Sequence, residues 1–368
     1  MHPTTTTAVV QTGIGALELR TLPIPEIGDD DALLRVEACG ICGSDREQLE
    51  GAFPTAALPA IPGHEPVGRI AAIGASAARR WGVAEGDRVA VEPLLSCHEC
   101  PTCRSGHYER CPDLTLYSFI SVDEPPGLWG GYAEHLYLDR RAIVHPIDGD
   151  LPPEVAVLFN PLASGFRWAV ELPRTTIGDH VVVLGPGQRG LASVIAASQA
   201  GAATITVSGL ATDRHKLDLA LRLGASEAVV VSDDDITARV MEVTDGHGAD
   251  VVVDTTPRAF EPLVTAIGFA APGARFVLAG TKGHRPVEGL VLDLLIRQEI
   301  TMVGARGVTS PSYRAAIRAI ESGDVPLELM ATHAFGLADA AHAIGVLSGD
   351  VPGERPVSVC LKPELRDP

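Results

Sequence analysis

The chain has few aromatic residues and no long apolar run. Only 4% of its 368 residues are Phe, Trp or Tyr, so Val, Ala, Leu and Ile must fill the core. The hydrophobic fraction of 46% is ample for that purpose. No apolar run could span a bilayer, and the first ten residues lack the basic and apolar segments of a signal peptide. We therefore expect a cytoplasmic protein of about two domains that does not associate with membranes.

Basic residues are scarce as well. The sequence has 29 Lys and Arg against 47 Asp and Glu, a formal net charge of −18. Such a charge opposes binding to a phosphate backbone, which argues against a nucleic-acid partner. In a reducing compartment the 7 cysteines are expected to be metal ligands or free thiols rather than disulfides.

A glycine-rich turn organises the second half of the chain. Four apolar residues, Val181 to Leu184, read as a buried parallel strand, and the Ala-rich run after the turn reads as a helix. Gly185, Gly187 and Gly190 between them give the spacing G-x-G-x-x-G. This context predicts a dinucleotide site, with the phosphates at the helix N-terminus. Gln188 and Arg189 lie inside the turn and complete the candidate contacts.

The regions around this turn predict two kinds of fold. From about Thr176 strands and helices alternate, the pattern of a doubly wound parallel sheet. The expected strands cover residues 180–184, 203–208, 227–231, 250–254, 275–279 and 299–303. Residues 1 to about 37 read as short strands separated by turns, which suggests a β-rich domain, and residues 128 to 144 return to strand alternation. A helix is expected from Pro153 to about Glu171, and a last strand over 356–361 is expected to return to the first domain.

Four cysteines lie close together in the first half. Cys97, Cys100, Cys103 and Cys111 follow the spacing C-x2-C-x2-C-x7-C. Four thiolates at such separations satisfy tetrahedral zinc, and the metal would hold a loop this short in place. An iron–sulfur cluster and disulfides are the alternatives. We expect a structural zinc that takes no part in chemistry.

A second set of candidate ligands is less distinctive. Cys42 lies in one glycine-flanked turn, and His64 and Glu65 lie in another. The spacing alone does not establish a metal site, because a Gly-His-Glu triplet is often an ordinary surface turn. A free cysteine is commonly a small buried apolar residue, and we interpret Cys39 and Cys360 in that way.

Five motifs stand in one order along nearly the whole chain. They are Gly40–Asp45, Gly63–Glu65 with Gly68, the four-cysteine lobe, Gly86–Val89 and the Gly185–Gly190 turn. The order resembles that of zinc-dependent medium-chain alcohol dehydrogenases, especially the sorbitol and threonine dehydrogenase branch. The resemblance implies an α/β protein of two domains. The first would be a GroES-like catalytic domain over 1–158 and 305–368, with its zinc lobe near 96–112. The second would be a Rossmann domain, a doubly wound parallel sheet, over 159–304. It places the active site in the cleft between the two domains.

The resemblance also implies the roles of individual residues. Cys42 and His64 would ligate a catalytic zinc, with Glu65 a ligand or immediately behind the metal. Asp45 would hydrogen-bond the free nitrogen of His64, and Ser44 would contact the substrate hydroxyl. The implied reaction is reversible hydride transfer between a nicotinamide and a zinc-held secondary alcohol, polyol or amino alcohol.

Three positions depart from the family pattern. Asn160 stands where the family often has a Glu, and as a poor zinc ligand it would at most hydrogen-bond a water. Glu47 stands where many relatives have a proton-relay His; it either carries the proton or is a solvated helix charge. Arg189 replaces a usually apolar residue in the glycine turn and could pair with the pyrophosphate or with a loop carboxylate.

The choice between NAD and NADP depends on the end of the second strand. No acid occupies that position, where an NAD-selective site has one. Gly209, with Arg214 and Lys216 nearby, could accommodate a 2′-phosphate, which slightly favours NADP. In the alternative interpretation Asp213 caps the next helix and the cations face water.

Two other functions compete with an alcohol dehydrogenase. One is a zinc-free, quinone-reductase-like NADPH oxidoreductase, and the other is a non-catalytic nucleotide-binding relative. The resemblance further implies a homodimer or a homotetramer built through the nucleotide domain, with a small-molecule substrate.

Overall fold

The structure is a computed structural model, and it describes residues 3–365. The described chain divides into two compact units. The first runs up to Asn160 and also takes in Ile320–Gly323 and the segment from Leu327 onward. The second holds Pro161–Ala319 and Asp324–Pro326. This division groups residues 305–319 with the second unit, so the expected domain boundaries at 158 and 305 stay a prediction.

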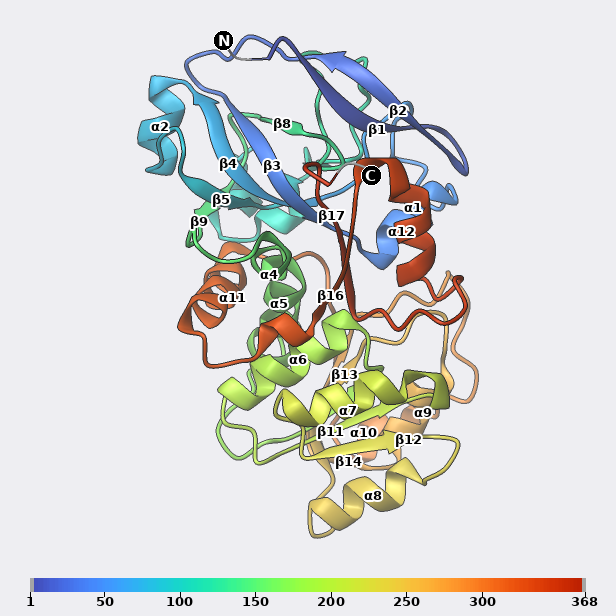
Figure 1. The fold of residues 1–368 in the computed structure, drawn as a ribbon. Helices are drawn as coiled ribbons and strands as arrows, with labels where there is room; N and C mark the ends of the chain where they lie inside the picture. Colours follow the sequence, from blue (N-terminus) through green and yellow to red (C-terminus); the bar gives the residue numbers. More distant parts are fainter. Residues whose placement is uncertain (1–2, 366–368) are drawn as a thin grey trace. The chain divides into compact units, whose positions relative to one another are not determined.

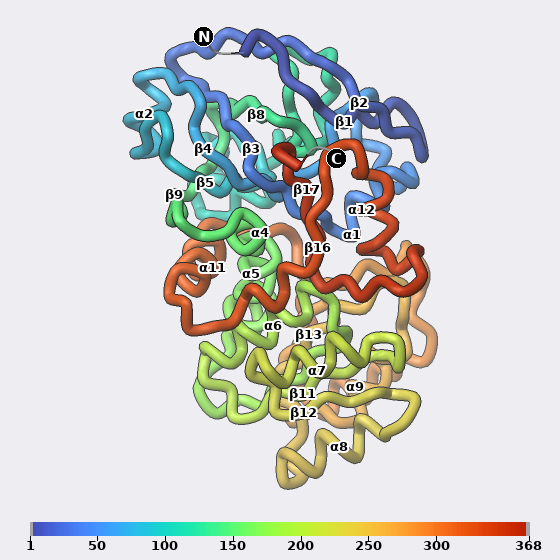
Figure 2. The backbone as a smooth tube through the Cα atoms, viewed as in Figure 1, coloured from blue at the N-terminus to red at the C-terminus, as the bar shows by residue number. Residues whose placement is uncertain are grey.

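The first unit is built on a mixed sheet of seven strands. Its order is β16-β17-β3-β4-β5-β9, with β8 also paired to β3. The strands are β3 (Ala32–Gly40), β4 (Glu65–Ile73), β5 (Arg88–Val91), β8 (His135–Leu138), β9 (Val144–Pro146), β16 (Ala331–Phe335) and β17 (Ser358–Leu361). The hairpin of β1 (Thr5–Gly13) and β2 (Ala16–Pro23) adds a second layer, and their apolar side chains share one core. Figure 2 shows the red C-terminal strand beside the blue N-terminal one, as the antiparallel pairing of β17 with β3 requires.

Short helices complete the first unit. They are α1 (Gly43–Leu49), α2 (Ala75–Trp81), α3 (Pro101–Arg104), α4 (Pro153–Ala156) and α12 (Ala340–Leu347). A two-stranded ribbon, β6 (Leu94–Leu95) with β7 (Thr115–Leu116), frames the segment that carries the four cysteines. This ribbon fixes both ends of the cysteine lobe.

The second unit is a parallel sheet of six strands in the order β12-β11-β10-β13-β14-β15. The strands are β10 (His180–Leu184), β11 (Thr204–Gly209), β12 (Glu227–Val230), β13 (Ala249–Asp254), β14 (Ala270–Leu278) and β15 (Thr301–Gly304). Val181 to Val183 are buried because helices cover both faces of the sheet. In Figure 1, α6 (Gln188–Gln199) and α7 (Arg214–Arg222) lie in front, and the fainter α9 (Glu261–Ile267) and α10 (Leu292–Arg297) lie behind.

The predicted fold class is confirmed, with two local errors. The helix expected from Pro153 to Glu171 is divided into α4, α5 (Phe159–Phe166) and a π-helical turn over Arg167–Glu171. Pro161 explains the break, because it lacks the N–H that a continuous helix would donate to Val157. Of the strand alternation expected over 128–144, only His135–Leu138 and the first residue of β9, Val144, lie in strands.

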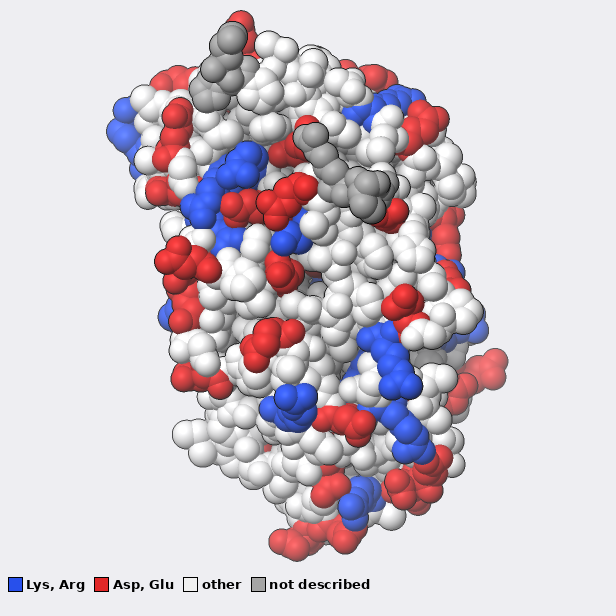
Figure 3. Space-filling view, viewed as in Figure 1, with Lys and Arg blue, Asp and Glu red and all other residues white. Residues whose placement is uncertain are grey.

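Two global properties complete the description. None of the helices formed by the described residues combines the length and the apolar character needed to cross a lipid bilayer. On the face in Figure 3, groups of acidic and basic side chains are interspersed; the net charge of the whole chain is −18.

Candidate functional site

The first candidate site lies where β3 ends beside the start of β4. Antiparallel pairing sets Gly40 opposite Glu65, which brings the turn before α1 next to the start of β4. The ligand atoms of Cys42, His64 and Glu65 lie within 4.8 Å of one another. A Cβ at Gly40 would lie 2.6 Å from Glu65 Oε2, so a larger residue at position 40 would displace this carboxylate from its present position.

Asp45 orients the histidine of this site. Its Oδ1 lies 3.3 Å from His64 Nδ1, and its Oδ2 accepts a hydrogen bond of 2.7 Å from the backbone N–H of Cys42. The other ring nitrogen, His64 Nε2, lies 3.8 Å from Glu65 Oε1. One nitrogen therefore faces a supporting carboxylate, and the other lies nearer Glu65, the arrangement typical of a metal-ligating histidine.

The electrostatics of the cluster favour a cation. Burial opposes the charged imidazole, but the Asp45 carboxylate and Cys42 outweigh it and raise the pKa of His64 well above its ordinary value. A cluster that holds a proton this firmly attracts positive charge. One sulfur, one imidazole nitrogen and one carboxylate oxygen are all donors that zinc accepts, so the residues fit a zinc ion.

Tyr132 is a member of this site that the sequence analysis missed. Its side chain is fully buried, and burial with the nearby Asp45 carboxylate raises its pKa well above the ordinary value. A Cβ at Gly63 would lie 2.2 Å from the Tyr132 ring, and the φ of Gly63 is +87°. The glycine pair before Tyr132 was the available signal, but it does not reveal which segment the ring packs against.

The remaining predicted residues of this site lie on two helices. Ser44 and Glu47 are partly buried on α1, three residues apart and hence on one face. Asn160 is buried at the start of α5. Their expected parts in proton transfer and water binding stay predictions.

The four cysteines form the second cluster. Their sulfur atoms all lie within 4.8 Å of one another, with 3.5 Å between Cys97 and Cys111. Backbone N–H groups of Cys100 and Cys103 point at the preceding cysteine sulfurs, at 3.4 Å in each case. The seven cysteines, all among the described residues, form no disulfide, which does not support the disulfide alternative. Four thiols with N–H donors around them fit a structural zinc.

The glycine turn joins β10 to α6 as predicted. Gly185 has a φ of +96°, which favours glycine, and a Cβ at Gly190 would lie 2.0 Å from the carbonyl oxygen of Gly185. Gly187 is the N-cap of α6, and a Cβ there would meet nothing within 4 Å. The turn therefore has open space where a pyrophosphate would approach, and the residues fit a dinucleotide.

Arg189, the charged residue inside this turn, contacts two other side chains. Arg189 donates to Ser164 Oγ at 2.8 Å and lies 5.5 Å over the ring of Trp168, while Gln188 is buried in the first turn of α6. The predicted contact of Arg189 with a pyrophosphate or a loop carboxylate stays a prediction.

The end of β11 carries the residues that would distinguish NAD from NADP. Gly209 ends the strand, and a Cβ there would lie 2.8 Å from Pro186. Arg214 pairs with Asp233, and Lys216 Nζ lies 3.1 Å from Asp213 Oδ1. Both cations therefore already have carboxylate partners.

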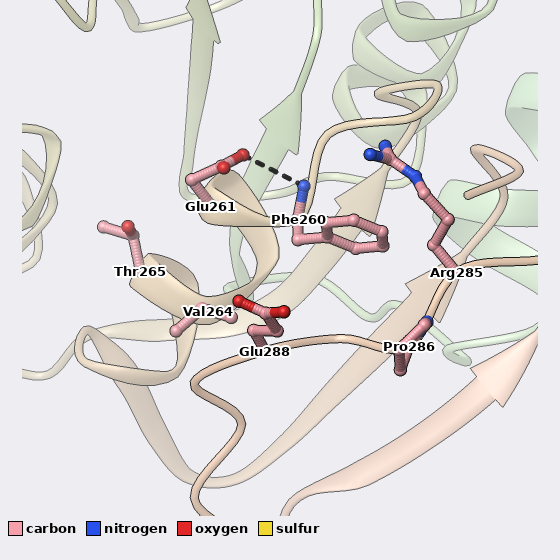
Figure 4. Close-up of a pocket in the computed structure, with 7 residues that line it drawn as sticks. All are labelled: Phe260, Glu261, Val264, Thr265, Arg285, Pro286 and Glu288. Carbon is pink, nitrogen blue, oxygen red and sulfur yellow. Dashed lines mark hydrogen bonds between the residues drawn. The ribbon is translucent and has the colours of Figure 1, made fainter. Parts of the chain in front are cut away.

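A separate pocket of about 570 Å³ lies in the second unit (Figure 4). Arg285 lies 4.7 Å over the Phe260 ring, and Glu261 and Glu288 supply carboxylates. None of the predicted site residues lines this pocket, so it is not part of the candidate site.

Comparison with known proteins defines the class. Residues 28–149 match the family described as alcohol dehydrogenase GroES-like domain, and residues 190–322 match zinc-binding dehydrogenase. The Mycobacterium tuberculosis protein named "Probable alcohol dehydrogenase adh" is 46% identical over 94% of this chain and 95% of its own length. The erythritol/L-threitol dehydrogenase of Mycolicibacterium smegmatis is 31% identical over 97% of both chains. A Sinorhizobium meliloti structure, named a zinc-binding dehydrogenase and bound to NADP, has a TM-score of 0.86 at 29% identity, over 98% of this chain and 100% of its own.

The fold, the two donor clusters and these matches agree on one class, the zinc-binding dehydrogenases. The chain belongs to the zinc-dependent medium-chain alcohol dehydrogenase family, which confirms the resemblance noted in the sequence.

Proposed function

We propose that the protein is a zinc-dependent NAD(P) alcohol dehydrogenase that transfers hydride between a small secondary alcohol, polyol or amino alcohol and a nicotinamide. The observation that carries this proposal is the orientation of His64, held between Asp45 and Glu65 beside Cys42. Zinc held by Cys42, His64 and Glu65 would act as a Lewis acid that polarises the substrate oxygen and favours loss of its proton.

The chain's own residues would hold the metal and move the proton. Asp45 keeps His64 in the tautomer that leaves Nε2 available as a ligand. Ser44, in the first turn of α1, would accept the proton of the substrate hydroxyl. Glu47, on the same face of the helix, would pass that proton to solvent. Asn160 is neutral, so the negative charge of the ligand set would come from the thiolate and the Glu65 carboxylate.

The primary test is alcohol-dependent reduction of NAD and NADP across a set of alcohols, polyols and amino alcohols. Cys42→Ala should abolish the activity and remove one zinc per chain, whereas Cys360→Ala, at a buried thiol outside both donor clusters, should change neither. Full activity in Cys42→Ala would favour a zinc-free reductase. No activity with any alcohol, despite two zinc ions per chain, would favour a non-catalytic relative.

We propose NADP as the preferred cofactor. No acid ends β11, and Arg214 and Lys216 follow at the start of α7; the Sinorhizobium meliloti relative was solved with NADP. Binding a 2′-phosphate would require Arg214 to exchange its partner Asp233 for the phosphate. Arg214→Ala should lower kcat/KM for NADP by roughly tenfold or more and leave NAD unaffected. Arg222→Ala, on the same helix, is the matched control.

The assembly state and the location are separate proposals. We propose a homodimer or homotetramer built through the second unit, because β15 is an edge strand and nearby α10 exposes Leu292 and Ile296. Light scattering on Ile296→Glu against the parent chain would test this. The cytoplasmic location stays a prediction; it agrees with seven cysteines that form no disulfide among the described residues.

A further inference from the structure

An ion pair between a buried carboxylate and a half-buried lysine lies at the edge of the parallel sheet where its strands end. Asp254 is the last residue of β13 and is fully buried. Lys282 follows β14, and its Nζ lies 2.8 Å from Asp254 Oδ2. Neither residue belongs to the predicted sites, although β13 adjoins β10, the strand that enters the glycine turn.

Thr256 links the two charges. Its backbone N–H and its hydroxyl donate to Asp254 Oδ1, at 3.0 and 2.5 Å. Lys282 Nζ donates to the Thr256 carbonyl oxygen at 2.6 Å and to Thr256 Oγ1 at 3.1 Å. The three N–H groups of the ammonium therefore meet three oxygen atoms, so this lysine is engaged in holding the chain.

The segment held in this way rests on the glycine turn. The backbone N–H and the hydroxyl of Thr255 both donate to the Leu184 carbonyl oxygen, and the hydroxyl also lies 3.0 Å from the Gly185 carbonyl oxygen. A Cβ at Gly185 would lie 3.0 Å from Thr255 Oγ1 and 3.1 Å from Thr256 Cγ2. The position of residues 255–256 thus limits where the turn can lie.

The position of the Asp254–Thr256–Lys282 cluster in the sheet indicates its role. The strand order reverses between β10 and β13, and ligands of open parallel sheets bind outside the strand ends at such a point. Buried ion pairs often add little stability compared with apolar residues of the same size, because desolvation offsets their attraction. An ion pair at this edge is better explained by the backbone that it positions.

We infer that Asp254 and Lys282 are positioning residues that hold Thr255 and Thr256 against the Gly185 turn, in the shape that receives the dinucleotide. The inference rests on the proposed function. It assigns to this pair a part in cofactor affinity, not in the chemical step. The pair would act through the turn and would not itself touch the phosphates.

The test is dinucleotide affinity, measured by fluorescence titration of NADPH and NADH. The double variant Asp254→Asn with Lys282→Met removes both charges, so neither is left buried alone. Its Kd should rise at least about tenfold, the effect of losing one to two well-placed hydrogen bonds. The matched control is Asp179→Asn with Arg275→Met, which removes another ion pair of the same unit, 2.8 Å long, before β10 and within β14. Its Kd should stay within about twofold of the parent value.

A thermal unfolding scan separates affinity from stability. If the Asp254/Lys282 double variant loses its cooperative transition, Thr256→Val tests the positioning role instead. This variant keeps both charges paired and removes only the linking hydroxyl, so its Kd for the dinucleotide should rise measurably. An unchanged Kd in the folded variant, or an equal rise in the Asp179/Arg275 control, would overturn the inference alone. A parent chain that binds neither dinucleotide would overturn the proposed function as well.

Discussion

Asp45 offers the sharpest test of the candidate metal site, because its two oxygens have different tasks. Oδ2 accepts from the Cys42 N–H at 2.7 Å, and Oδ1 faces His64 Nδ1 at 3.3 Å. Asp45→Asn keeps the size of the side chain but replaces one oxygen by an NH2 group. If the remaining oxygen still caps Cys42, the NH2 group faces Nδ1, and His64 must then carry its proton on Nε2, where a metal would bind.

The expected loss follows from this tautomer. Mutating the hydrogen-bond partner of a ligating histidine typically costs about 10–100-fold in metal affinity, which corresponds to about 1.4–2.8 kcal/mol. Only the Cys42 cluster should lose affinity, because Asp45 supports two of its members, His64 and Cys42, and the cysteine lobe is a separate donor group. The cap on α1 is retained, so the thermal unfolding temperature of the metal-free protein should change little.

The assay is competition for zinc by a chromogenic chelator. The parent chain should release its zinc in two steps, and Asp45→Asn should weaken one of them. Asp87→Asn serves as the control, since Asp87 Oδ2 accepts from the Ala84 N–H at 2.8 Å in an exposed turn, away from both clusters. Equal zinc retention in Asp45→Asn and Asp87→Asn would refute the reasoning about His64.

Two further predictions test the Cys42 cluster and the four-cysteine lobe by other measurements. Gly40→Ala places a Cβ 2.6 Å from Glu65 Oε2 and should lower the zinc content from two to about one per chain, whereas Gly43→Ala, which meets nothing within 4 Å, should not. Elemental analysis of both proteins decides this. After zinc removal, hydrogen bonds from the Glu99 and Cys100 backbone leave the pKa of Cys97 lowered to about 7, so its alkylation rate should rise about tenfold from pH 6 to pH 8. Burial raises the pKa of Cys360 to about 12, and this thiol should stay unmodified in the same mass-spectrometric experiment; its reaction in the folded protein would contradict that burial.

The sequence predicted features that depend on neighbouring residues. The glycine turn, the four-cysteine lobe and the strands of the parallel sheet are each encoded in a short window, because spacing and apolar periodicity act locally. The strand expected over 180–184 forms with those bounds. The helix expected through Glu171 is interrupted at residues 157–158, where Pro161 cannot donate to Val157, although the proline was visible in the sequence.

Only the tertiary structure decided which distant residues meet. Pairing of β3 with β4 sets Gly40 against Glu65, and the packing of Tyr132 on Gly63 joins segments that no periodicity relates. Asp254 and Lys282 meet because β13 and β14 are parallel neighbours whose following loops leave the sheet at one edge. The sequence by itself determined the chemical groups and the local turns that carry them. Their geometry depends on strand order and register, which are set by the burial of the whole core and by pairings far apart in the chain.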